Sequence, residues 1–78
     1  MDIYVGNLPS DITGSDLRAV LEPFGRVETA DVVRRRHGDE SRGFGFVGMP
    51  ARSEGVCAVL GVHGRNLNGR TITALVEP

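Results

Sequence analysis

The stretch SRGFGFVGM, residues 41–49, decides the fold of this chain. Its glycines are spaced as G-x-G-x-x-G, a pattern found in dinucleotide-binding turns and in kinase phosphate loops. They are Gly43, Gly45 and Gly48. The same letters also fit a short strand with Phe44 and Phe46 on one face, because successive side chains of a strand point to opposite faces. The two interpretations lead to different functions, one a phosphate-binding loop and the other a surface of aromatic rings.

The surroundings of the glycines favour the strand. A dinucleotide-binding motif follows a strand, opens a helix and has an acidic residue about 20 residues later. Here the preceding HGDES (37–41) is typical of a loop, Pro50 follows at once, and no acidic residue lies at the right distance after a further strand. A kinase loop needs a lysine and a far longer chain, whereas these 78 residues contain no lysine.

Three further segments predict strands. IYVGNL (3–8) alternates, with Ile3 and Val5 on one side and Tyr4 on the other. Residues 26–34 are rich in β-branched residues, but apolar and polar side chains alternate unevenly, which allows a bulge. Residues 71–77 form the last strand, after the hairpin dipeptide Asn68-Gly69.

Two segments between these strands predict helices. Thr13 is a good N-cap with Asp16 three residues later, and apolar side chains follow at helical spacing until Pro23 and Gly25. The core-facing ones are Leu17, Val20, Leu21 and Phe24. Residues 51–61 predict a weaker amphipathic helix, with Val56, Val59 and Leu60 on its apolar face and Ala58 nearby. The order strand, helix, strand, strand, helix, strand is the α+β ferredoxin-like βαββαβ plan, a four-stranded antiparallel sheet with two helices on one face.

Length and composition limit the function classes. A chain of 78 residues fits one small domain, 1–78, and no two-lobed enzyme. No apolar run approaches the ~20 residues of a membrane span. Cys57 is alone, which excludes an internal disulfide and a cysteine metal cluster and predicts a small buried thiol in a reducing cytoplasm. The net charge of −1 lacks the basic excess common in nucleic-acid-binding domains.

The strand interpretation of residues 42–49 predicts an exposed aromatic surface. If Val47 and Met49 pack beneath the helices, Phe44 and Phe46 lie on the open face of the sheet. Tyr4 joins them, since its side chain is expected on the face opposite to that of its apolar neighbours Ile3 and Val5. The inverted alternation would expose four apolar residues and would need helices on both faces, which two helices cannot supply. An aromatic cluster beside arginine is a binding surface.

Two motifs then resemble a known family. RGFGFVGM resembles the octamer of the RNA recognition motif, and IYVGNL resembles its partner hexamer. EPFG and LNGR match as well, so the resemblance covers essentially the whole chain, and it extends to compact single-domain bacterial RNA-binding proteins. It implies that Tyr4 and Phe46 each stack a base, that Phe44 packs against sugars, and that Arg42 pairs with a phosphate. Asn7 matches the family's asparagine, where capping its own turn is an alternative to RNA contact.

Other residues extend the predicted site. Arg34 and Arg36, in an arginine run, are expected to contact phosphates, with a solvated loop as the alternative. Thr73 and Leu75 are expected to line the sheet face and to contact a base. Acidic side chains on the flanks are expected to restrict phosphate approach. They are Glu28, Asp31 and Glu77.

These observations predict a cytoplasmic monomer that binds single-stranded RNA by stacking, with single-stranded DNA left open. A protein-interaction module of the same fold is the alternative. An enzyme is not expected, because an acylphosphatase on this plan needs an arginine in the loop after the first strand, and NLPSDITG has none. No arrangement of His, Asp and Ser or of paired carboxylates suggests catalysis, and neither a metal nor a cofactor is expected.

Overall fold

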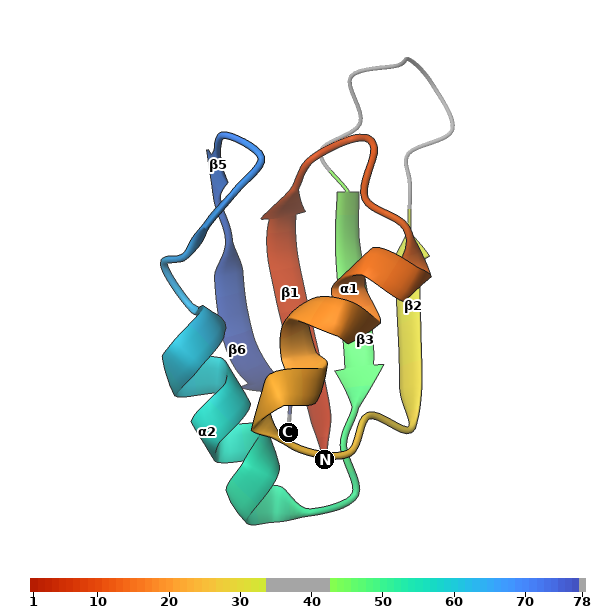
Figure 1. Ribbon diagram of the computed structural model, residues 1–78, viewed down its shortest axis with the longest axis vertical. Helices are drawn as coiled ribbons and strands as arrows, with labels where there is room; N and C mark the ends of the chain where they lie inside the picture. Colours follow the sequence, from red (N-terminus) through yellow and green to blue (C-terminus); the bar gives the residue numbers. More distant parts are fainter. Residues whose placement is uncertain (34–42, 78) are drawn as a thin grey trace.

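A four-stranded antiparallel sheet is covered on one face by two helices (Figure 1). The computed structural model describes residues 1–33 and 43–77. In the sheet the strands follow the order β2-β3-β1-β6, namely β2 (Thr29–Val33), β3 (Gly43–Gly48), β1 (Asp2–Leu8) and β6 (Thr73–Glu77). The helices are α1 (Gly14–Leu21), a short 3-10 helix η1 (Glu22–Phe24) and α2 (Arg52–Val62). The predicted α+β plan is confirmed.

Helix α1 begins at the predicted cap. The Asp16 amide donates to Thr13 Oγ1 at 3.2 Å, and the Thr13 amide donates to Asp16 Oδ2 at 3.0 Å. This reciprocal pair satisfies two of the amides that a helix start leaves without intrahelical partners. Pro23 lies in η1, and Gly25, at φ 155°, ends this segment.

A bulge near the end of β1 reorients the chain. Val5 pairs with Gly45 and Leu8 pairs with Gly43, so β1 has one more residue than β3 between these pairs. Asn7 takes φ 60°, the left-handed conformation that asparagine tolerates better than most residues. Because of the extra residue, Leu8 and Val5 both face the core and both are fully buried. The β2–β3 ladder, where the sequence allowed a bulge, is regular from Thr29 to Val33.

The core lies between the sheet and the helices. Its apolar side chains come from both helices, all four strands and the connections between them. Val47 is fully buried and Met49 is 1% exposed, which confirms the inward half of β3. At Gly45 an added Cβ would lie 2.7 Å from Leu17 Cδ2 of α1 and 2.7 Å from the Asp31 carbonyl oxygen, so helix, β2 and β3 approach closely at this glycine.

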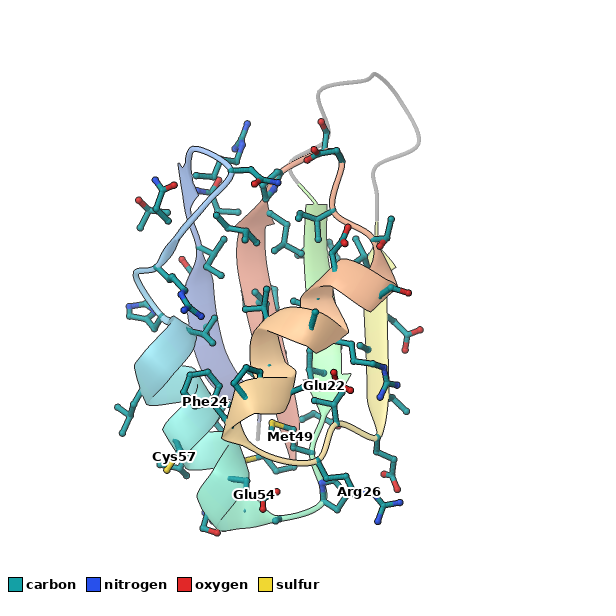
Figure 2. All side chains as sticks on the ribbon, viewed as in Figure 1. Glu22, Phe24, Arg26, Met49, Glu54 and Cys57 are labelled. Atoms are coloured by element: carbon teal, nitrogen blue, oxygen red, sulfur yellow. The ribbon has the colours of Figure 1, made fainter. Side chains whose placement is uncertain are left out.

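The predicted core face of α2 is wrong in part: Ala58 and Val59 lie in or against the core, but Val56 and Leu60 do not. Its buried residues are Gly55, Ala58 and Val62, whereas Val56 is exposed and Leu60 is 77% exposed. At Gly55 the absence of a side chain leaves room for Met1, whose sulfur occupies the space that a Cβ would need. Cys57 is also exposed, on the side of α2 away from the core, and not buried as predicted (Figure 2).

The C-terminal part contains a hairpin before β6. β4 (Asn66–Leu67) and β5 (Arg70–Thr71) pair across Asn68 and Gly69, which have φ values of 48° and 89°. Two positive φ angles in succession are typical of the tight hairpin turn that Asn-Gly predicts. Among the described residues, no helix is long and apolar enough to cross a membrane.

Candidate nucleic-acid interface

Three aromatic rings meet on the sheet face that the helices leave open. The ring centroids of Tyr4 and Phe44 are 5.9 Å apart, those of Tyr4 and Phe46 are 5.9 Å apart, and those of Phe44 and Phe46 are 5.8 Å apart. Two of the contacts are edge-to-face, an arrangement that aromatic pairs prefer. Phe46 is 38% exposed although it is large and apolar. The three rings, hereafter the aromatic platform, therefore form an ordered apolar surface in contact with water.

Cross-strand pairing defines what surrounds the platform. In the central row Phe46 pairs with Tyr4 on one side and with Asp31 on the other, and Tyr4 pairs in turn with Leu75. Leu75 is 51% exposed and extends the apolar surface onto the edge strand. In the next row Phe44 pairs with the exposed Val33. Directly paired residues share a face. The central row of the open face therefore begins with the acidic Asp31 on β2 and ends with Leu75 on β6.

A polar network holds the end of β1 against the hairpin. The Arg70 guanidinium donates to Asn7 Oδ1 at 3.0 Å, and Asn7 Nδ2 donates to the Thr71 carbonyl oxygen at 2.8 Å. Both hydrogen bonds join segments that are more than sixty residues apart in the sequence. Asn7 therefore has a structural role here, and it also fixes a guanidinium at this end of the sheet.

Charge on the open face is unevenly distributed. At the end opposite to Arg70, Asp2 pairs with Gly48 and with Glu77, which places two carboxylates in one row. Asp31 adds a third at the β2 edge of the platform. Phosphates are repelled by carboxylates and attracted by guanidinium, so the end of the sheet near Arg70 and Asn7 is the favourable one for a phosphate backbone.

The structure brings most of the predicted site together. Tyr4, Phe44, Phe46 and Leu75 share the open face, and Thr73 joins them opposite Gly6. Asn7 lies at the end of β1 and contacts the hairpin. Arg34, Arg36 and Arg42 lie outside the described residues.

Two residues at this face were missed by the sequence interpretation. Val33 lies beside Phe44, and strand alternation from Asp31 would have found it. Arg70 reaches Asn7 only through the folded hairpin, and no local pattern indicates that contact. Within residues 1–33 and 43–77, no group of three or more His, Cys, Asp or Glu side chains could hold a metal ion.

Comparisons with known proteins agree with this geometry. Residues 3–73 match the family model described as RNA recognition motif. The chain is 46% identical over 70 residues to the 28 kDa chloroplastic ribonucleoprotein of Nicotiana sylvestris, covering 90% of this chain and 25% of that protein. It is 38% identical over 72 residues to the putative RNA-binding protein RbpA of Synechocystis sp., covering 92% of this chain and 71% of that protein.

A solved structure shows the same fold. The crystal structure of RNA-binding protein PG1 superimposes with a TM-score of 0.85 at 34% identity, covering 100% of this chain and 98% of that one. The chain spans about a quarter of the length of several plant relatives that it matches, among them the tobacco protein. With both motifs on the central strands and the aromatic platform exposed, the chain belongs to the RNA recognition motif family.

Proposed function

We propose that the chain binds single-stranded RNA by stacking bases on Tyr4 and Phe46, with Phe44 packed against the sugars between them. As a member of this family it is a binding domain and not an enzyme. The observation that supports the mechanism is the aromatic platform, three rings within 6 Å of one another on an uncovered sheet face. Stacking on such rings contributes about 1–3 kcal/mol per base.

Arginine side chains complete the proposal by contacting the RNA backbone. Arg34, Arg36 and Arg42 are proposed phosphate contacts from the sequence, and Arg70 joins them because Asn7 holds its guanidinium at the favourable end of the face. Thr73 and Leu75 extend the surface beside Tyr4, so they are proposed to contact a neighbouring nucleotide. Asn7 is proposed to contact RNA in addition to its structural bonds.

Single substitutions of the stacking residues test this function. Tyr4→Ala and Phe46→Ala are each expected to weaken binding of short single-stranded RNA by about 5- to 150-fold, the equivalent of 1–3 kcal/mol. Fluorescence anisotropy with a labelled hexanucleotide measures the change, and a DNA competitor of matched sequence tests whether DNA is also accepted.

Ring-preserving variants provide the control. Tyr4→Phe and Phe46→Tyr keep a ring at each position and are expected to bind RNA nearly as well as the unchanged protein. Thermal unfolding checks that each alanine variant is folded. Folded alanine variants with unchanged affinity would show that the rings do not stack bases.

A second candidate function is protein interaction through a helix face. It is favoured by the exposed apolar side chains of Val56 and Leu60, one turn apart on α2. Amide chemical-shift changes during titration with RNA distinguish the two, because RNA binding moves signals of β1 and β3. Changes confined to α2 would favour the second candidate. A monomer in the cytoplasm remains our prediction, and sedimentation of the protein tests the monomer.

A further inference from the structure

We propose that Asp31 selects guanine as the base stacked on Phe46. The inference rests on the proposed function and deepens it, since it names the base that the platform prefers. It starts from the pairing of Asp31 with Phe46 across β2 and β3, which places a carboxylate beside the most exposed ring of the platform.

The side chain of Asp31 is well placed to reach the edge of a stacked base. Directly paired residues have Cβ atoms about 4.5–5.5 Å apart on the same face, and a base stacked on Phe46 extends beyond the ring. Asp31 is exposed. No hydrogen bond or ion pair joins its carboxylate to another residue among 1–33 and 43–77, so no described neighbour competes with a base for it.

The other neighbours of Phe46 do not offer this chemistry. On the opposite side lies Tyr4, two strands away from Asp31, and beyond it the apolar Leu75, three strands away. Neighbouring strands are about 4.8 Å apart, so a base on Tyr4 lies roughly 10 Å from β2 and out of hydrogen-bonding range of Asp31. The base on Phe46 is therefore the one that Asp31 contacts.

The chemistry of the base edges favours guanine. Single-stranded RNA exposes its Watson–Crick edges to protein side chains. A carboxylate offers only acceptors, and its two oxygens match two adjacent donors. Guanine has such a pair, N1–H and the exocyclic N2 amino group, whereas adenine and cytosine place an acceptor beside their single amino group. Uracil has one N–H between two carbonyl oxygens, which the carboxylate repels.

Oligonucleotides that differ by one functional group test the inference. The probes are uridine pentamers with a central guanosine, inosine, adenosine or uridine, and inosine lacks only the N2 amino group of guanosine. The unchanged protein is expected to bind the guanosine probe about tenfold more tightly than the adenosine or uridine probe, within the range for bidentate base contacts. The inosine probe is expected to lie between them.

Substitution of Asp31 then assigns the preference to this carboxylate. In Asp31→Asn the guanosine preference is expected to fall to about twofold or less. Affinity for the all-uridine probe is expected to stay equal or rise, because a negative charge near the phosphates is removed. The matched control is Glu22→Gln, which removes the same charge from η1 on the helix side of the molecule (Figure 2). It is expected to keep the full preference.

Three outcomes would overturn the inference. They are an unchanged preference in Asp31→Asn, equal binding of guanosine and inosine probes, and loss of the preference in Asp2→Asn but not in Asp31→Asn. Asp2 is the comparison because, among the described residues, it is an acid on the same face two positions from Tyr4 along β1. Each of these leaves RNA binding intact. Failure of the proposed function looks different, because Phe46→Ala would then retain affinity for every probe.

Discussion

Tyr4 extends over the backbone of β1 because the next residue on its face, Gly6, has no side chain. A Cβ at Gly6 would lie 2.6 Å from Tyr4 Oη and 2.9 Å from Cε2, closer than real contacts allow. The Gly6 backbone is not in the left-handed region, so alanine is conformationally acceptable there. A single methyl group at this position therefore acts on the orientation of the ring and not on the strand.

The variant Gly6→Ala is expected to weaken RNA binding about 5- to 20-fold with little loss of stability. The Tyr4 ring must move aside, and it then no longer offers the same face to a base. Its far end is free to move without disturbing the core, so the free energy of unfolding is expected to change by less than about 1 kcal/mol. Anisotropy measures the affinity, and urea denaturation measures the stability.

Gly45→Ala serves as the contrasting control at the same scale. Its methyl group would meet the backbone oxygen of Asp31 and the buried Leu17, neither of which moves freely. Overpacking of this kind costs about 1–3 kcal/mol. If Gly6→Ala proved equally destabilising, or bound RNA as tightly as the unchanged protein, the proposed role of Gly6 in orienting Tyr4 would be wrong.

At the scale of elements, the strands were more predictable than α2. Alternation in β3 correctly placed Phe44 and Phe46 outward and Val47 inward, because a strand has only two faces and one of them must be buried. In α2 the sequence places apolar residues all around the helix, so hydrophobicity does not single out a face. Tertiary packing decided instead, and it buried the small Gly55, beside the Met1 side chain, and Ala58.

The site was predictable to the same extent as the strands that form it. The rings of the platform follow from alternation together with the two motifs. The network of Asn7 and Arg70 does not, because it depends on the bulge in β1 and on how the β4–β5 hairpin folds back. Contacts between segments this far apart in sequence depend on tertiary geometry.

The corrected face of α2 leads to a test by alanine substitution. Val62→Ala is expected to lower the free energy of unfolding by roughly 1.5–3 kcal/mol, since Val62 is fully buried. Leu60→Ala removes a larger side chain, but the free energy of unfolding is expected to change by less than about 0.5 kcal/mol, because Leu60 is mostly exposed. Urea denaturation of both variants measures the difference. A larger loss for Leu60→Ala would mean that the face predicted from the sequence is the buried one.

At the scale of the whole molecule, a net charge of −1 is compatible with RNA binding only if the charges are separated in space. The sheet shows such a separation, with Asp2 and Glu77 in one row of the open face and Arg70 bonded to Asn7 near the opposite end of β1. Stacking energy depends little on salt, whereas phosphate contacts release counterions and depend on it strongly. Salt titration therefore distinguishes the two contributions.

Affinity for a short single-stranded RNA is expected to fall with salt at a slope of about −3 in log K against log salt concentration. Each neutralised phosphate of a single strand contributes about −0.7, and the proposed contacts are Arg34, Arg36, Arg42 and Arg70. Arg70→Gln keeps a donor for Asn7 and is expected to reduce the slope by about 0.7, whereas Phe46→Ala is expected to lower affinity at every salt concentration without changing the slope. Anisotropy titrations measure the affinity and the slope, at salt concentrations from about 50 to about 400 mM. A slope shallower than about −1 would contradict this division between arginine contacts and stacking. A slope that changes in Phe46→Ala but not in Arg70→Gln would contradict it as well.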